Sequence, residues 1–237
     1  MGHLATVKAT PYVDRPQTGG YNIYESALMP PTPGHTVFVV DDDEAVRKAV
    51  SRLLRSAGIA AAVFASPREF LAQYDPATPG CLVLDMAMPN FDGLQLQTAL
   101  TEKGCILPII FLTGHGDVSK SVQAMKQGAF DFLSKPAKDK DLLTAVRAAF
   151  ERDTVARREQ AKLSEIRALL DTLTPREREV LEHVVSGKLN KQIAGDLGIT
   201  EATVKMHRAH VMEKMKVQSV AELARLAERC GARGNSE

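Results

Sequence analysis

The chain has 237 residues, which suits one or two domains, and its 44% hydrophobic content is ordinary for a globular chain that buries a core. Its 30 basic and 29 acidic residues nearly balance, so overall charge does not point to a nucleic acid, and any such surface must be local. The apolar runs are too short to cross a bilayer and the amino terminus lacks a signal-peptide pattern, so we expect a cytoplasmic protein without a membrane partner.

Residues 1–34 contain scattered proline and glycine without sustained periodicity, which predicts a disordered tail. Short apolar segments then alternate with segments of helical spacing, and segments without polar alternation indicate strands buried on both faces. The expected strands are residues 37–40, 59–64, 81–84, 109–112 and 130–134. The expected helices are one that Asp43 caps and Gly58 ends, followed by residues 67–73, 94–103 and 118–127, the last capped by Asp117. This alternation predicts an α/β fold with a doubly wound, five-stranded parallel sheet.

Polar residues follow four of the predicted strands at their carboxyl ends. Asp41 and Asp42 follow the first strand, Asp85 the third, Thr113 the fourth and Lys135 the last. In open parallel sheets ligands gather outside these ends, so the side chains are expected to converge there. Carboxylate oxygens are the ligands that Mg²⁺ prefers, and an ammonium would neutralise part of their charge. For Asp85 alone, a role in opening the next turn would be the simpler interpretation.

Four motifs occur in order: Val-Asp-Asp, Leu-Asp-x-x-Met-Pro, Leu-Thr-Gly and Lys-Pro. Together they resemble the receiver domain of two-component response regulators, with its flavodoxin-like sheet, over about residues 35–150. The resemblance implies that Asp85 accepts a phosphoryl group from a cognate histidine kinase. It also implies that Asp42, Asp85 and, more indirectly, Asp41 hold Mg²⁺ together with the carbonyl of Ala87.

The same resemblance assigns a switch. Thr113 would sense the phosphoryl group, Lys135 would pair with it, and Phe132 would be the aromatic side chain that changes rotamer. The bond between Lys135 and Pro136 is expected to be cis, a form that X-Pro bonds adopt at modest cost. Ala137 departs from the family because many receivers carry an aromatic residue there, which leaves the packing after this turn open.

The loop Gly114-His115-Gly116 follows Thr113 and invites a nucleotide-binding interpretation. It lacks the third glycine of a dinucleotide fingerprint, so a loop beside the switch threonine is favoured. By the resemblance, His115 occupies a position that tunes how quickly water or a phosphodonor reaches the aspartate.

Residues 139–173 have a helical pattern whose first part is apolar on one side and packs on the sheet. Residues 151–172 are highly charged and predict a helical linker that is either solvated or paired with a second copy. The heptads are broken, which argues against a long coiled coil.

A second domain is predicted to begin with a capping box in which Thr174 is the N-cap, Pro175 the first helical residue and Glu177 the reciprocal partner. Asn190 and Thr200 are expected to cap two further helices, which a short turn containing glycine joins. This is a helix-turn-helix in a small all-α domain.

The charge is basic in this second domain. Residues 188–216 contain six basic and three acidic residues, a local excess that suits phosphate contact. The strings Leu-Thr-x-Arg-Glu-x-Glu-Val-Leu, Asn-Lys-Gln-Ile-Ala and Thr-Val-Lys-x-His-Arg resemble the LuxR-type DNA-binding domain, assigned to residues 173–228 and followed by a tail, residues 229–237. With the receiver in front, the whole resembles the NarL/FixJ family, on the FixJ side.

The exposed face of the third helix of this domain is expected to enter the DNA groove, with other basic residues nearer the backbone. The groove-facing residues would be Thr203, Lys205, Met206 and Arg208, and the backbone contacts Lys188 and Lys191.

These patterns predict a transcriptional regulator, not an enzyme, that dimerises on phosphorylation and binds promoter DNA, with RNA polymerase as a further candidate partner. Two alternatives stay open. One is a phosphorylation-independent DNA-binding regulator with a vestigial pocket. The other is a phosphatase that uses Asp85 as a covalent nucleophile, but haloacid-dehalogenase-like enzymes carry a second aspartate where Ala87 stands.

Overall fold

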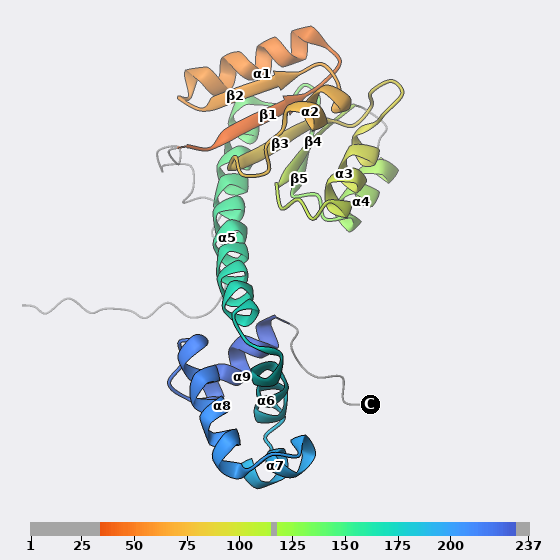
Figure 1. Cartoon of the computed structure of the whole chain (residues 1–237). Helices are drawn as coiled ribbons and strands as arrows, with labels where there is room; N and C mark the ends of the chain where they lie inside the picture. The colour runs from red at the N-terminus through yellow and green to blue at the C-terminus, as the bar shows by residue number, and fades with distance from the viewer. Residues whose placement is uncertain (1–33, 115–117, 231–237) are drawn as a thin grey trace, which may run out of the picture.

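The computed structural model describes residues 34–114 and 118–230. A sheet domain lies at one end, a long helix leaves it, and a small helical domain lies at the other end (Figure 1). The expected tail over residues 1–34 lies almost wholly outside the described residues, as do Asp117, His115 and most of the segment 229–237.

The sheet has five parallel strands in the order β2-β1-β3-β4-β5, which confirms the predicted fold. Every residue of β3 is buried, because helices cover both faces of this central strand. The strands are β1 (Thr36–Val40), β2 (Ala60–Phe64), β3 (Gly80–Asp85), β4 (Ile109–Thr113) and β5 (Asp131–Ser134).

Two apolar clusters sandwich the sheet. Helices α2, α3 and α4 cover one face, with Phe70 and Leu96 fully buried against β1 and β3, while α1 and the start of α5 cover the other, with Leu54 and Val146 fully buried. Successive strand residues point to opposite faces, so the inner strands β1, β3 and β4 supply both clusters. The helices are α1 (Glu44–Ser56), α2 (Pro67–Gln73), α3 (Gly93–Glu102), α4 (Val118–Lys126) and α5 (Asp139–Asp171).

Local sequence fixes where α1 begins and ends. The carboxylate of Asp43 accepts the N–H of Ala45 at 2.7 Å, as expected of an N-cap. Gly58, just past the helix, has a φ of +72°, a conformation that favours glycine. The chain therefore reverses there and enters β2.

Helix α5 is continuous over 33 residues. Its first turns bury Leu142, Val146 and Phe150 against the sheet, and the rest extends away from it to the helical domain (Figure 1). Within the residues described, no helix is long and apolar enough to cross a membrane.

The helical domain contains α6 (Pro175–Val185), α7 (Asn190–Leu197), α8 (Glu201–Lys214) and α9 (Val220–Arg229). Thr174 and Glu177 form the predicted capping box, and Thr200 caps α8 by accepting the N–H of Thr203. Val180, Ile193, Val204 and Leu223, one from each helix, meet in a single apolar core.

Two details of this domain differ from the sequence prediction. Asn190 is the first residue of α7 and not its cap, because Leu189 takes the N-cap position and its N–H donates to Gln192 Oε1 at 2.8 Å. The prediction also omitted α9, although Ser219 caps it by accepting the N–H of Glu222 at 3.1 Å. Serine followed three residues later by glutamate was a usable signal for a helix start.

Candidate functional site

Three carboxylates converge at the carboxyl edge of the sheet. Asp41 directly follows β1 and is fully buried, Asp85 ends β3 and is 5% exposed, and Asp42 is exposed. One oxygen from each lies within 4.8 Å of the other two. The expected convergence of these residues is therefore present in the structure, because adjacent parallel strands end at the same edge.

Lys135 supplies the counter-charge. Its Nζ lies 2.7 Å from Asp41 Oδ2 and 2.8 Å from Asp85 Oδ1. Burial lowers the pKa of Lys135, but its hydrogen bonds to the two aspartates outweigh burial, so the pKa lies above its ordinary value. Burial raises the pKa of Asp85, and Lys135 opposes that rise. One ammonium thus partly neutralises a site with three carboxylates.

The donor set fits a hard divalent cation. Mg²⁺ prefers oxygen ligands and is usually bound by one or two carboxylates, with the remaining positions filled by water or phosphate. Asp42, which is exposed, and Asp85 can offer such oxygens, while Asp41 already accepts the N–H of Asp43 at 2.9 Å and the ammonium of Lys135. Both carboxylate oxygens of Asp41 are therefore engaged within the protein. Ala87 is exposed, and its backbone N–H bonds to the carboxylate of Asp85.

The expected switch residues lie on the neighbouring strands. Thr113 ends β4 and is 4% exposed, and its carbonyl accepts the N–H of Lys135 at 2.7 Å. The peptide bond between Lys135 and Pro136 is cis, as expected. Phe132 on β5 is 45% exposed, so its ring lies on the surface in this structure.

Sequence reasoning missed two residues that support this edge. Nη1 of Arg47, in the first turn of α1, donates to the carbonyl of Asp41 at 2.7 Å and so holds the loop that carries the acidic residues. At Gly93, the first residue of α3, a Cβ would lie 2.5 Å from the carbonyl oxygen of Asp85. Only glycine allows α3 to approach β3 so closely. Gly93 acts across the fold, and the contact of Arg47 with a carbonyl six residues back follows no spacing pattern that the sequence analysis used.

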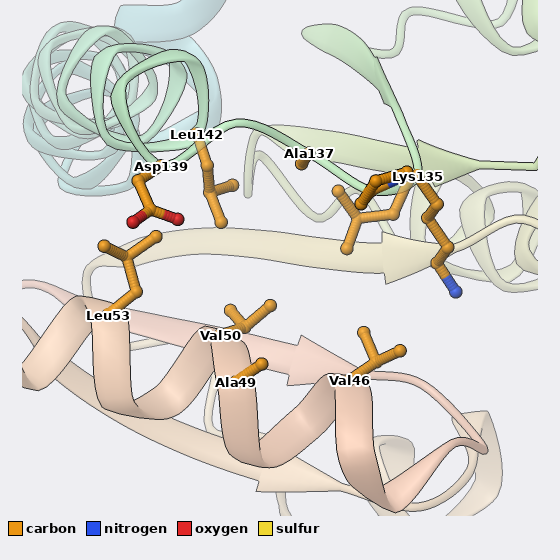
Figure 2. A pocket seen from close by; sticks show the side chains of 10 residues that line it. Val46, Ala49, Val50, Leu53, Lys135, Ala137, Asp139 and Leu142 are labelled. Carbon is orange, nitrogen blue, oxygen red and sulfur yellow. The ribbon is translucent and has the colours of Figure 1, made fainter.

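A hollow of about 410 Å³ opens beside Lys135, between α1 and the start of α5 (Figure 2). Val46, Val50 and Leu53 of α1 line one side and Leu142 of α5 the other. Ala137, where many receivers carry an aromatic residue, lines this hollow with only a methyl group. The chain after the Lys135-Pro136 turn therefore packs beside the hollow without an aromatic ring.

The candidate DNA-binding residues lie on α8 and around the start of α7. Lys205 and Met206 are exposed, while Val204, Val211 and Met215 bury the opposite side of α8. A second hollow of about 500 Å³ brings together three of the predicted cations, Lys188, Lys191 and Arg208.

Two of these predicted contacts are already engaged within the domain. Lys188 forms an ion pair with Asp196 at 2.7 Å, and the hydroxyl of Thr203 lies 2.9 Å from that of Thr200. Lys191 and Lys205 are exposed.

Two family models match the chain, one to each domain. Residues 37–147 match the response regulator receiver domain, and residues 171–227 match the luxR family of bacterial regulatory proteins. The chain is a response regulator of the NarL/FixJ family. It is therefore a two-component transcriptional regulator with a LuxR-type helix-turn-helix domain.

Known relatives are similar to this regulator in sequence along most of their length. Nodulation protein W of Bradyrhizobium diazoefficiens is 46% identical over 209 residues, which cover 85% of this regulator and 92% of the relative. FixJ of Azorhizobium caulinodans is 45% identical, over 81% of this regulator and 90% of the relative. The solved structure of the response regulator StyR is 44% identical with a TM-score of 0.70, over 83% of this regulator and 99% of that chain.

Proposed function

We propose that this regulator accepts a phosphoryl group on Asp85 from a cognate histidine kinase and then dimerises to bind promoter DNA. The observation that carries the proposal is the contact of Asp85 with Lys135, beside the buried Asp41, at the carboxyl edge of a receiver sheet. A nucleophilic carboxylate with an ammonium at 2.8 Å suits attack on a phosphoryl group whose negative oxygens need a cation.

In the proposed transfer, a carboxylate oxygen of Asp85 attacks the phosphorus of the kinase phosphohistidine. A bond from that oxygen to phosphorus forms, the bond from phosphorus to the imidazole nitrogen breaks, and the imidazole leaves with the electron pair. Lys135 stabilises the phosphoryl oxygens, and Asp42 and Asp85, with the Ala87 carbonyl, would hold Mg²⁺ while Asp41 supports them. When bound, Mg²⁺ neutralises charge that accumulates on the transferring group.

The hollow beside Lys135 supports the approach of a protein donor from this side. Val46, in the first turn of α1, lies at the end of the hollow near Lys135, and Leu53 lies at the other end (Figure 2). A kinase surface that fills the hollow would place its histidine near Asp85. The hollow is lined by residues of both α1 and α5, so such a contact would involve both helices (Figure 2).

Phosphorylation adds about −1.5 to −2 charges and acceptor oxygens to Asp85, enough to attract the hydroxyl of Thr113. Inward movement of Thr113 would open space for the exposed ring of Phe132. Phe132, together with exposed Val122 and Met125 of α4, would then form an altered apolar surface. A partner shifts the equilibrium between the two conformations of the switch only if it binds one of them better than the other. The proposed partner is a second receiver.

A dimer would present two α8 helices to two half-sites about one DNA turn apart, or a multiple of it. The exposed residues of α8 and the cations near α7 would contact the groove and backbone. RNA polymerase would be a further partner at the promoter.

The decisive experiment is labelling with a small phosphodonor in the presence of Mg²⁺. We expect an acid-stable, base-labile acyl phosphate that Asp85→Asn abolishes, because an amide is not a nucleophile. Asp171→Asn, which alters an exposed carboxylate far along α5, is the matched control and should keep the label. Full labelling of Asp85→Asn would contradict the assignment.

A second experiment separates the proposal from a phosphorylation-independent regulator. Protein loaded with beryllofluoride should sediment as a dimer and bind two-half-site DNA more tightly, and Thr113→Ala should weaken both effects. Thr98→Ala, an exposed threonine of α3, is the control. Unchanged sedimentation and affinity in protein that has bound the mimic would favour the vestigial pocket instead.

A further inference from the structure

A buried carboxylate lies outside the site described above. Asp153 is fully buried and lies on α5 just past Phe150, where the helix leaves the sheet. Burying a charge is costly unless it is paired and hydrogen-bonded. The partners of this buried carboxylate therefore show how α5 is held where it leaves the receiver core.

Asp153 joins α5 to the loop before β3. Its Oδ2 accepts the N–H of Gly80 at 3.0 Å, and Nε of Arg157, one turn further along α5, donates to both carboxylate oxygens at 3.0 and 2.8 Å. The guanidinium of Arg157 also donates to three carbonyls of that loop, those of Pro76, Ala77 and Thr78 at 2.9, 3.3 and 2.8 Å. The planar fork of arginine satisfies several acceptors at once.

A further contact fixes the same turn of α5. The hydroxyl of Thr154 lies 3.2 Å from Nε2 of His35, and that nitrogen lies 3.6 Å from Asp153. The receiver thus holds α5 from both the start of β1 and the loop before β3. We call Asp153, Thr154 and Arg157 the receiver clamp.

The far end of α5 is part of the DNA-binding domain. Ile166 is buried in the core of that domain. Arg229 of α9 pairs with Glu159 at 2.7 Å, and the carbonyl of Leu170 accepts Nη2 of Arg178 at 3.0 Å. Ile166 lies nine residues past Arg157, and in that stretch the continuous helix of α5 carries the exposed pair of Glu159 with Arg229.

We infer that the receiver clamp makes α5 a rigid coupling, whose helical phase sets the orientation of the recognition helix α8 relative to the receiver. Asp153 and Arg157 are positioning residues in this arrangement, since they hold the helix to the loop before β3 and lie outside both the acidic edge and the helices α6–α9. In a receiver dimer, the helical phase of α5 also sets whether the two α8 helices can bind two half-sites at once. This second statement rests on the proposed function. An exposed linker that bends freely would leave that orientation undefined.

Distances within one chain test the rigidity without any phosphorylation. Spin labels are placed with Arg55→Cys on α1 and Arg225→Cys on α9, both exposed positions, after Cys105→Ser and Cys230→Ser. We expect one narrow distance distribution by pulsed electron resonance, and one at least ~2-fold broader with Arg157→Ala, because a broken buried pair frees the local turn. Arg167→Ala, an exposed position on the same helix, is the control. A broad distribution in the parent, or no broadening with Arg157→Ala, overturns the inference.

Insertions after residue 160 test the phase. Two alanines rotate α8 by about 200°, whereas seven alanines restore its direction to within about 20° and add about 10 Å of length. In beryllofluoride-loaded protein we expect the two-alanine variant to bind two-half-site DNA at least ~10-fold more weakly than the parent and the seven-alanine variant to stay within ~3-fold, because avidity is lost when geometry forbids joint engagement. Both variants should bind a single half-site like the parent.

Equal effects of the two insertions, whether both are tolerated or both abolish binding, overturn the role of helical phase. If beryllofluoride fails to tighten binding by the parent itself, the proposed function fails, and the distance distributions then decide the rigid coupling alone.

Discussion

Arg157→Ala is the substitution for which the structure gives the largest expected effect outside the acidic site. It leaves Asp153, which is fully buried in the intact protein, with the N–H of Gly80 at 3.0 Å and the imidazole of His35 at 3.6 Å, and it removes the donor from three loop carbonyls. Breaking a buried ion pair by removing one partner costs about 3–5 kcal/mol, because the other charge stays buried without compensation.

That figure must be reduced for this site. The side chain of Arg157 is 23% exposed, so water reaches part of the pair, and the loop carbonyls can bond to solvent. We therefore expect Arg157→Ala to lower the free energy of unfolding by about 2–4 kcal/mol. Urea unfolding followed by near-ultraviolet circular dichroism of Tyr74 reports on the receiver, since that ring packs against Phe38 and Phe70.

Lys162→Ala is the matched control on the same helix. It removes an exposed pair, Lys162 with Glu159, in which the side chains are 57% and 48% exposed, and should cost no more than about 0.5 kcal/mol. Adding Asp153→Asn to Arg157→Ala should recover part of the loss, because an amide carries no charge to bury. A loss under about 1 kcal/mol for Arg157→Ala, with no coupling in the double-mutant cycle, would refute the buried pair as a source of stability.

Three further predictions concern the two functional regions. Lys135→Ala should leave Mg²⁺ binding largely intact in a titration but weaken the dimerisation response to beryllofluoride, since it deletes the cation that faces Asp85; an unchanged response would contradict that role. Lys205→Ala and Arg208→Ala should each weaken binding to specific DNA by about 1–3 kcal/mol where a bidentate base contact is lost. If neither substitution changes the affinity or its dependence on salt concentration, the proposed docking face is wrong. A hydrogen bond from Lys214 holds the pKa of Glu177 at about 2, below its unfolded value of 4.5, so its contribution to stability is complete above pH 4.5 and is lost as the pH falls toward 2. Glu177→Gln should flatten the dependence of the melting temperature on pH in this range. An unaltered dependence would show that Glu177 does not contribute to it.

The sheet and the acidic edge could be predicted because their signals are local. Four consecutive apolar residues before Asp85 define a buried strand, and a polar residue at the end of each neighbouring strand must lie at the same edge. The capping box of Thr174 and Glu177 is equally local, and it appears in the structure as predicted.

The missed features depend on individual side-chain and backbone contacts, two of them between segments far apart in the sequence. Arg47 reaches a carbonyl six residues back, Gly93 is required by the approach of α3 to β3, and Arg157 bonds to a loop about 80 residues earlier. No pattern of spacing contains that information. The charged run that contains Asp153 therefore looks like a solvated linker in the sequence, although its first turns belong to the receiver surface.

The arrangement of the domains constrains how phosphorylation can act on DNA binding. The clamp at Asp153 and Arg157 ties the middle of α5 to the receiver, and the exposed pair of Arg229 with Glu159 joins the next turn to α9. Figure 1 places α8 at the end of the molecule far from the sheet. Among the described residues the receiver does not cover α8. We therefore propose that control comes from bringing two copies together at the receiver, with α5 transmitting the geometry of that pair to the two α8 helices. Regulation by this route predicts that a single half-site is bound equally well with and without beryllofluoride, and that only paired half-sites show the difference, which a titration of the two DNA fragments measures directly.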